Sequence, residues 1–224
     1  MSLNRTPLHA SAPRRFPAAL VALLVLNILP ELIMQMGDRG IAVPPYARPL
    51  AYHLGAFQPD LLTSSGSVYF GQSLLMFFTY GFLHTGFVHF GINILGLIWL
   101  GRIILSYRTS ETFLIVYLMS MVGAAEVFAL IGSQEGMLAG ASGALFGLLG
   151  VYAVDHRVLI PAKSRNSTGF QITWLILTTS TLVLGDLLSQ RLFGTSVGWQ
   201  AHAGGFLTGA IIALVLPPRY AVAS

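Results

Sequence analysis

The sequence predicts an all-α polytopic membrane protein, and its composition, its apolar runs and its loop charges all lead to that class. Of the 224 residues, 54% are hydrophobic and 9% are charged, and the mean hydropathy is +0.73. A soluble domain carries about a quarter charged residues. Because apolar runs of about 20 residues recur along the chain, a water-soluble fold would have little polar surface to present.

The composition also excludes several kinds of site. The chain has no cysteine, and therefore no disulfide, thiolate nucleophile or cysteine metal ligand. Its net charge is +4, but the basic residues form no patch with interleaved aromatic residues, which argues against nucleic-acid binding. No H-E-x-x-H motif occurs. We expect neither a metal nor a cofactor.

Six apolar segments predict membrane-spanning helices, each needing about 20 residues. The stretch 68–106 is too long for one span and too short for two, so we interpret 68–83 as an interfacial segment. Its aromatic residues suit the lipid–water boundary; they are Tyr69, Phe70, Phe77, Phe78, Tyr80 and Phe82. The predicted spans are 17–36, 85–105, 112–131, 139–154, 170–190 and 199–216.

These spans form one predicted membrane domain, residues 17–216. Residues 1–16 are polar and basic and are expected to form a disordered cytoplasmic tail, and 217–224 a second, short one. We expect a polar, proline-containing loop over 37–67. The first apolar segment is long for a signal peptide and ends in no convincing cleavage site, so we expect it to be retained.

The loop charges predict the orientation. With the N-terminus in the cytoplasm, nine basic residues lie inside and three outside, in agreement with the positive-inside rule. The nine are Arg5, Arg14, Arg15, Arg102, Arg108, Arg157, Lys163, Arg165 and Arg219, and the three are Arg39, Arg48 and Arg191. We expect a bacterial cell (inner) membrane, because the chain is small and short-tailed and has no targeting sequence.

A serine stands among glycines in the fourth predicted span, in the stretch LAGASGALFG. From Ser142 to Val154 there are 13 residues, and Asp155 then marks the cytoplasmic boundary. Such a helix rises about 20 Å, whereas the hydrocarbon core is about 30 Å thick. Ser142 is therefore predicted to begin a helix below the outer surface, facing a water-containing cavity that opens outward.

Two other spans carry polar groups that converge on the same level. His89 and Asn93 are four residues apart and share a helix face, and His84 lies near the entrance of that helix. Glycine stripes let two helices approach closely, which would bring Ser142 within hydrogen-bond reach of His202. The glycines of these stripes are Gly140, Gly143, Gly147, Gly150, Gly198, Gly205 and Gly209.

Together these groups supply the parts of an acyl-transfer site. A serine is a weak nucleophile until a base, usually histidine, removes its proton. The oxyanion that then develops needs hydrogen-bond donors. His89 and Asn93 offer side-chain donors, and a helix that begins at Ser142 offers backbone N–H groups. Membrane serines and glycine stripes usually serve backbone bonding and packing only, but intramembrane histidines are functional candidates.

The motifs resemble those of the rhomboid intramembrane serine proteases. They are GASG on the fourth span, HTGFVHFGIN on the second and AHAGG on the sixth. The resemblance covers about residues 17–216 and implies a minimal six-transmembrane-helix bundle of the bacterial type with a membrane-embedded outer loop. It also implies a Ser–His dyad that cleaves transmembrane protein substrates near their outward-facing end.

Carried over by position, the resemblance makes Ser142 the nucleophile and His202 the general base. His89, Asn93 and the backbone N–H groups of Ala141 and Ser142 match the oxyanion site. Structural roles near the site fall to His84, Gly140, Gly143, Phe146 and Gly205.

Two positions depart from the family pattern. Many members have tyrosine where this chain has Phe146, although an aromatic face can still stack on the base. Many also have a Trp-Arg pair in the first outer loop, where this chain reads QSLLMFFTYG. The bonding within that loop therefore stays open.

Three acidic residues in or near the spans are not part of this pattern. We expect Glu126 to form a helix–helix hydrogen bond. Asp186 could orient His202, although the resemblance implies a dyad without a third member. Glu31 has no assigned role.

Three other functions fit the sequence less well. A catalytically silent rhomboid-like chaperone or substrate-binding scaffold would lack the serine or the histidine. A transporter or proton channel would need acidic residues along a path across the bilayer, whereas the polar residues gather at one level. A metalloprotease or haem site lacks an evident carboxylate ligand. The substrate and the oligomeric state are not specified by the sequence.

Overall fold

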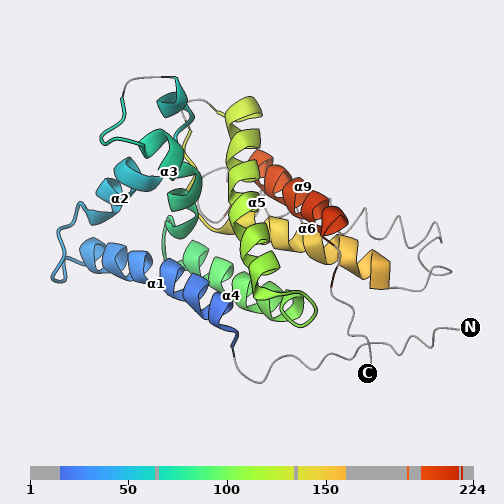
Figure 1. Ribbon diagram of the computed structural model, residues 1–224. Helices are drawn as coiled ribbons and strands as arrows, with labels where there is room; N and C mark the ends of the chain where they lie inside the picture. Colours follow the sequence, from blue (N-terminus) through green and yellow to red (C-terminus); the bar gives the residue numbers. More distant parts are fainter. Residues whose placement is uncertain are drawn as a thin grey trace, which may run out of the picture.

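The computed structural model describes residues 16–63, 66–133, 136–159, 191, 198–216 and 218, and every regular element within them is a helix (Figure 1). Helices occupy five of the six predicted spans. They are α1 (Ala18–Asp38), α4 (Phe87–Ile104), α5 (Ser110–Ile131), α6 (Ser142–Leu159) and α9 (Trp199–Val215). The predicted span 170–190 and most of both predicted tails lie outside the described residues, so the count of six stays a prediction.

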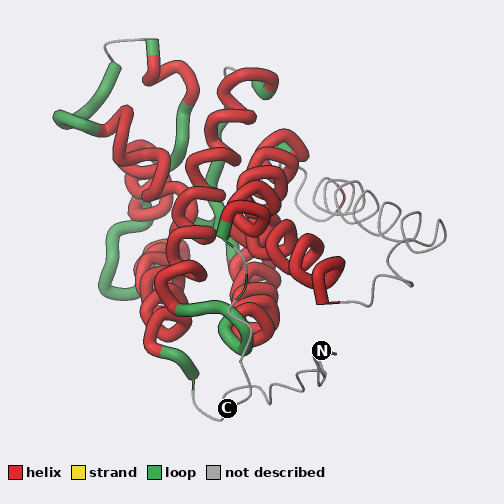
Figure 2. Tube along the Cα trace, turned by 45° about the vertical axis from the view of Figure 1, so that its right-hand side comes forward, coloured by secondary structure: helices red, strands yellow, loops and turns green. Residues whose placement is uncertain are grey.

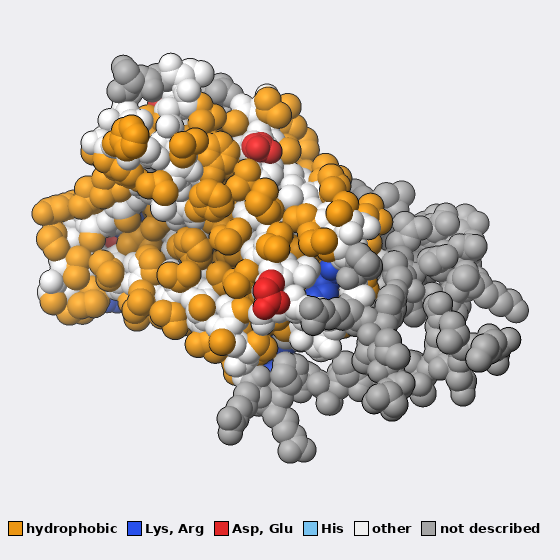
Figure 3. Space-filling view, in the orientation of Figure 1, with side chains coloured by type: hydrophobic (Ala, Val, Ile, Leu, Met, Phe, Trp, Pro, Cys, Tyr) orange, Lys and Arg blue, Asp and Glu red, His pale blue; other side chains and the backbone are white. Residues whose placement is uncertain are grey.

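The described helices have the surface of a membrane protein. By length and composition, α1, α4 and α5 could each cross a bilayer, and α6 and α9 are shorter apolar helices. Hydrophobic side chains cover most of the face seen in Figure 3, with few charged groups among them. Large apolar residues such as Leu29, Leu95 and Leu130 are more than half exposed, as expected for helices that face lipid.

The expectation of a loop over residues 37–67 was wrong in part, because this segment contains two helices, α2 (Ala47–Gly55) and η1 (Pro59–Leu62). They are followed by α3 (Gln72–Thr79) and η2 (Tyr80–Phe82). We call residues 39–86 the α1–α4 connection. Polar side chains of this connection bond to nearby backbone. Gln72, for example, donates to the His53 carbonyl at 2.7 Å and accepts from the Val68 N–H at 2.7 Å.

Arg48 fastens this connection to α1 and to the start of α4. Its Nη2 lies 3.0 Å from Glu31 Oε1, and its Nε lies 2.8 Å from Asp38 Oδ2. It also donates to the His84 carbonyl, which accepts a second bond from Tyr52 Oη at 2.8 Å. Burial alone would lower the pKa of Arg48, but hydrogen bonds to Asp38, Glu31 and Tyr52 raise that pKa above its ordinary value. Glu31 is thus the buried half of an ion pair.

Glycines bring α6 and α9 into backbone contact, as their spacing predicts. The two helices lie side by side and both pack against α5 (Figure 2). A Cβ at Gly205 would lie 2.0 Å from the Gly143 carbonyl oxygen, and one at Gly209 would lie 1.9 Å from that of Gly147. No real Cβ approaches so closely, so the separation of these helices requires glycine at both positions.

The expected helix–helix hydrogen bond of Glu126 was wrong. Gly123 and Val127 form the face of α5 that meets α9, since a Cβ at Gly123 would strike Thr208 and one at Gly204 would strike Val127. This arrangement points Glu126 outward, and its side chain is exposed. Among the described residues it has no hydrogen-bond partner.

Substitution of Gly209 by alanine tests the backbone contact. Gly209→Ala should lower the free energy of unfolding by roughly 1–3 kcal/mol, the usual cost of overpacking, because the obstructing atom is the Gly147 carbonyl oxygen. Gly91→Ala is the matched control, since a Cβ at Gly91 would meet nothing within 4 Å. Unfolding in mixed micelles measures both variants. Equal stability of the two would contradict the close contact.

Removal of the Arg48 charge tests the attachment of the α1–α4 connection. Arg48→Gln leaves the buried Glu31 carboxylate, whose side chain is 2% exposed, without its cation. The free energy of unfolding should fall by about 3 kcal/mol. Arg39→Gln removes an exposed guanidinium that, among the described residues, hydrogen-bonds only to Gln35, and should have little effect. The same unfolding measurement compares them, and an Arg48 variant as stable as the control would refute the attachment.

Candidate active site

Ser142 and His202 come from different helices and lie within hydrogen-bond distance. Ser142 is the first residue of α6, and His202 lies in the first turn of α9. Their Oγ and Nε2 atoms are 3.0 Å apart, although the residues are 60 positions apart in the chain. Because both helices begin at the same end of the bundle, the glycine contacts between them place the serine hydroxyl beside the imidazole. An unprotonated Nε2 can accept the serine proton.

The ring of Phe146 holds the His202 imidazole in place. Phe146 follows Ser142 by about one helical turn, and its ring stacks on His202 with centroids 4.1 Å apart and planes 16° apart. His202 Nδ1 is buried and has no hydrogen-bond partner in the part of the chain that the structure describes. The described contacts that fix the His202 ring are thus the stack on Phe146 and the hydrogen bond with Ser142, and no carboxylate among the described residues bonds to it. Asp186, the suggested orienting group, lies outside the described residues.

Gly140 lets His89 approach the segment that leads into α6. Its φ of +132° lies in a region that residues with a side chain rarely adopt, and a Cβ there would lie 2.6 Å from His89 Cε1. The Gly140 N–H donates to the Tyr80 carbonyl at 2.9 Å, which fixes the turn. A residue with a side chain at position 140 would have to displace the His89 ring.

The hydrogen bonds of His89 indicate its tautomer. The backbone N–H of Thr85 lies 3.4 Å from His89 Nδ1, and the Thr85 hydroxyl lies 3.0 Å from the same atom. A backbone N–H can only donate, so Nδ1 accepts and the ring proton is assigned to Nε2. His89 therefore presents an N–H donor on the ring edge that lies beside Gly140.

Asn93 lies one turn further along α4. Its Nδ2 donates to the His89 carbonyl at 2.8 Å, and its Oδ1 is buried without a hydrogen-bond partner among the described residues. A carboxamide has two N–H bonds, and one of them is used here. The structure thus brings His89 against the segment that precedes Ser142, while the described bond of Asn93 is to its own helix.

The backbone at the start of α6 is shaped by its neighbours. The first N–H groups of a helix have no acceptor within it, and α6 begins at Ser142 directly after the buried Ala141. A Cβ at Gly143 would lie 2.7 Å from Ala124 Cβ and 3.1 Å from Tyr80 Oη. Gly143 is therefore required for α5 and η2 to pack against the start of α6.

His84 lies behind His89 and does not contact the dyad. Its ring meets those of His89 and Phe90 edge-on, each with a centroid distance of 5.4 Å. It is fully buried, and both ring nitrogens are without a hydrogen-bond partner among the described residues. Burial, together with the nearby His89 and Arg48, lowers the pKa of His84 to about 3. The ring is therefore neutral at neutral pH and acts as a packing group.

Sequence reasoning missed two residues that shape this region. Tyr80 was expected at the lipid–water boundary, but it is buried, and its hydroxyl donates to the Met121 carbonyl at 2.9 Å. Its role depends on long-range contacts that no local pattern reveals. Thr85, which sets the tautomer of His89, stands four residues before it, and that helical spacing was a usable signal.

The α1–α4 connection also reaches the segment before Ser142. Phe57 and Leu138 form an isolated antiparallel bridge, with N–O distances of 3.1 and 2.9 Å. Backbone hydrogen bonds to Phe57 and Tyr80 therefore hold the segment 138–140, which precedes Ser142.

Comparison with known proteins identifies the family. The family model of the Rhomboid domain matches residues 71–219, more than half of the chain, and the match includes Ser142 and His202. No curated protein matches the chain. The matched region runs from the residue before α3 to beyond the end of α9. This match and the apolar helices show that the chain belongs to the rhomboid family and is a multi-pass membrane protein.

Proposed function

We propose that this rhomboid is an intramembrane serine endopeptidase that cleaves transmembrane protein substrates through Ser142 and His202. The observation that carries the proposal is the 3.0 Å separation of Ser142 Oγ and His202 Nε2, because an isolated serine is a poor nucleophile. A catalytically silent scaffold would not require a base at this distance, a stacked aromatic ring behind it and donors beside it. No metal or cofactor enters the reaction.

The reaction follows from the positions of these groups. Ser142 Oγ attacks the carbonyl carbon of the scissile peptide bond while His202 Nε2 takes the serine proton. The carbonyl oxygen becomes an oxyanion, for which His89, the second N–H of Asn93 and the backbone N–H groups of Ala141 and Ser142 are the proposed donors. The peptide C–N bond then breaks and the amine leaves with the proton from His202. Water attacks the acyl-enzyme, with His202 again as base.

The substrate must expose its peptide bond before it can react. In an intact transmembrane helix, the carbonyl is occupied by a hydrogen bond and enclosed by side chains. Residues that are small or that weaken the helix are therefore expected near the cut. We propose that the substrate enters laterally, past the fifth predicted span (170–190) and beneath the α1–α4 connection. The distribution of basic residues supports a cytoplasmic N-terminus and a site that opens to the extracytoplasmic side.

Loss of either dyad residue should abolish activity. Ser142→Ala and His202→Ala should each remove labelling by a fluorophosphonate and cleavage of a model transmembrane substrate, while circular dichroism stays unchanged. Ser120→Ala is the matched control, because Ser120 is another buried serine but lies on α5, and it should be labelled normally. Wild-type turnover in either dyad variant would overturn the assignment. A folded wild type that is neither labelled nor active would favour the scaffold.

The stacking of Phe146 on the base gives a graded test. Phe146→Leu keeps an apolar side chain but loses the ring, and such pairs contribute roughly 0.5–1.5 kcal/mol. The rate of fluorophosphonate labelling should fall about three- to tenfold. Phe146→Tyr retains the aromatic face and should label at close to the wild-type rate. Equal rates for the leucine variant and the wild type would show that the stack does not position His202.

A further inference from the structure

A buried arginine joins α6 and α9 at the end opposite to Ser142 and His202. Arg108 precedes α5, and its Nε and Nη2 lie 2.6 and 2.7 Å from the two carboxylate oxygens of Asp155 on α6. The same guanidinium donates to the carbonyl of Ala213 on α9, at 3.4 Å, and to that of Leu216 just beyond it. Each side chain of the ion pair is 1% exposed. We call this arrangement the Arg108 clamp.

The clamp acts on the two helices that carry the candidate dyad. Asp155 follows Ser142 by 13 residues, which corresponds to about 20 Å of helix. Ala213 follows His202 by 11 residues, or about 17 Å. Each helix therefore begins at the dyad and reaches the clamp near its other end. A shift of one helix along the other would displace Ser142 Oγ relative to His202 Nε2 by the same amount.

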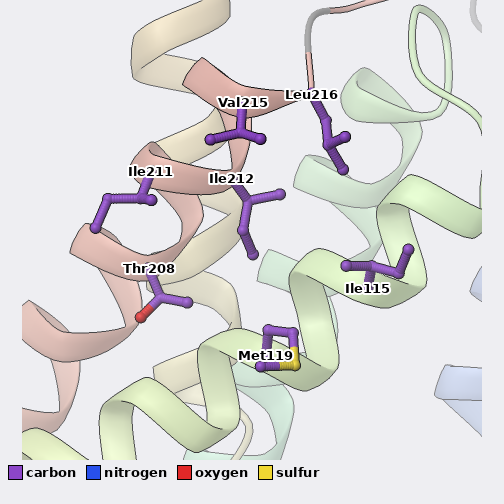
Figure 4. A pocket seen from close by; sticks show the side chains of 7 residues that line it. All are labelled: Ile115, Met119, Thr208, Ile211, Ile212, Val215 and Leu216. Carbon is purple, nitrogen blue, oxygen red and sulfur yellow. The ribbon is translucent and has the colours of Figure 1, made fainter.

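The contacts along the helix pair differ in kind from the clamp, which holds the far end with a charged group that bonds to both helices. Along the interface, the backbones of Gly143 and Gly147 meet those of Gly205 and Gly209, and at the dyad end Phe146 also stacks on His202. On the side of α5, an apolar groove of about 350 Å³ lies between residues of α5 and α9 (Figure 4). Its lining includes Ile115 and Met119 from α5, Thr208, Ile211 and Ile212 from α9, and Leu216 just beyond α9. Leu216, whose carbonyl binds Arg108, is one of these lining residues, so the guanidinium holds the chain at the edge of the groove.

The energetics of the ion pair favour a role in alignment. Removing two charges from water is costly, so a buried pair is often no more stable than well-packed apolar residues, and its best-attested use is to specify register. The guanidinium also satisfies carbonyls at the end of α9, where the last C=O groups of a helix have no partner within it. Its fork geometry allows a defined position relative to both helices.

We propose that Arg108 and Asp155 are positioning residues that set the axial register of α6 against α9 and thereby the Ser142–His202 distance. This inference rests on the proposed function only where enzymatic activity is the readout. A displacement of about 1 Å at a reacting group can cost on the order of 10²-fold in rate. The register is also measurable without activity.

The test replaces the clamp with apolar side chains. Arg108→Met combined with Asp155→Leu removes the bonds without leaving a buried charge. We expect wild-type circular dichroism, a fluorophosphonate labelling rate at least about tenfold lower, and a reduced kcat for a model transmembrane substrate with unchanged KM. Arg102→Met is the control, because Arg102 lies in the last turn of α4 and contacts Phe16. A folded double variant with the wild-type labelling rate would overturn the proposal.

A distance measurement separates this inference from the proposed function. The chain has no cysteine, so spin labels at Leu149→Cys on α6 and Leu214→Cys on α9 report the register directly. Loss of the clamp should shift or broaden the label–label distance by about 1.5 Å or more, the rise of one residue. An unchanged distance refutes the inference, whether or not the wild type is active. If the double variant does not fold, Asp155→Asn in the same spin-labelled chain is measured instead. A changed label–label distance supports the inference and an unchanged one refutes it.

Discussion

Backbone contact between α6 and α9 is the constraint on which the rest of the site depends. Lipid offers little hydrophobic drive for helices to associate, so close van der Waals contact must supply much of the attraction. Gly143 with Gly205, and Gly147 with Gly209, provide that contact by omitting side chains. The same contact determines the separation of the two helix starts. The glycines therefore stabilise the helix pair and place the serine beside the histidine at once.

A second constraint comes from two arginines that bind backbone carbonyls, Arg108, which is buried, and Arg48, which is half-buried. Arg48 bonds to the His84 carbonyl ahead of α4, and Arg108 bonds to the Leu216 carbonyl beyond α9. An unpaired carbonyl in a low-dielectric interior is costly, and a guanidinium has five donors with which to satisfy several acceptors. Each arginine is neutralised by carboxylates, Glu31 and Asp38 in one case and Asp155 in the other. Each ion pair thus lies beside a helix end, the start of α4 for Arg48 and the end of α9 for Arg108.

The features that local spacing determines were predictable from the sequence. The start of α6 at Ser142, the shared face of His89 and Asn93 and the glycine stripes all follow from helical periodicity within one segment. The features that depend on distant partners were not. The polar, proline-containing segment 37–67 is predicted as a loop but contains α2, and Tyr80 is predicted at the lipid–water boundary but is buried. A helix–helix hydrogen bond is predicted for Glu126, but its side chain is exposed. Which face of α5 meets α9 depends on contacts with a distant segment, which the local sequence does not reveal.

Arg48 and Arg108 also bear on how far the loop charges support the proposed orientation. Arg108 was counted among nine basic residues on the cytoplasmic side, and Arg48 among three outside. Both are held in ion pairs and bond to backbone, so their positions are explained by packing. Leaving them out of the count gives eight against two, and the bias keeps its direction. The proposed orientation therefore rests on the other ten basic residues. The positions of Arg48 and Arg108 are explained by their bonds to the backbone ahead of α4 and beyond α9.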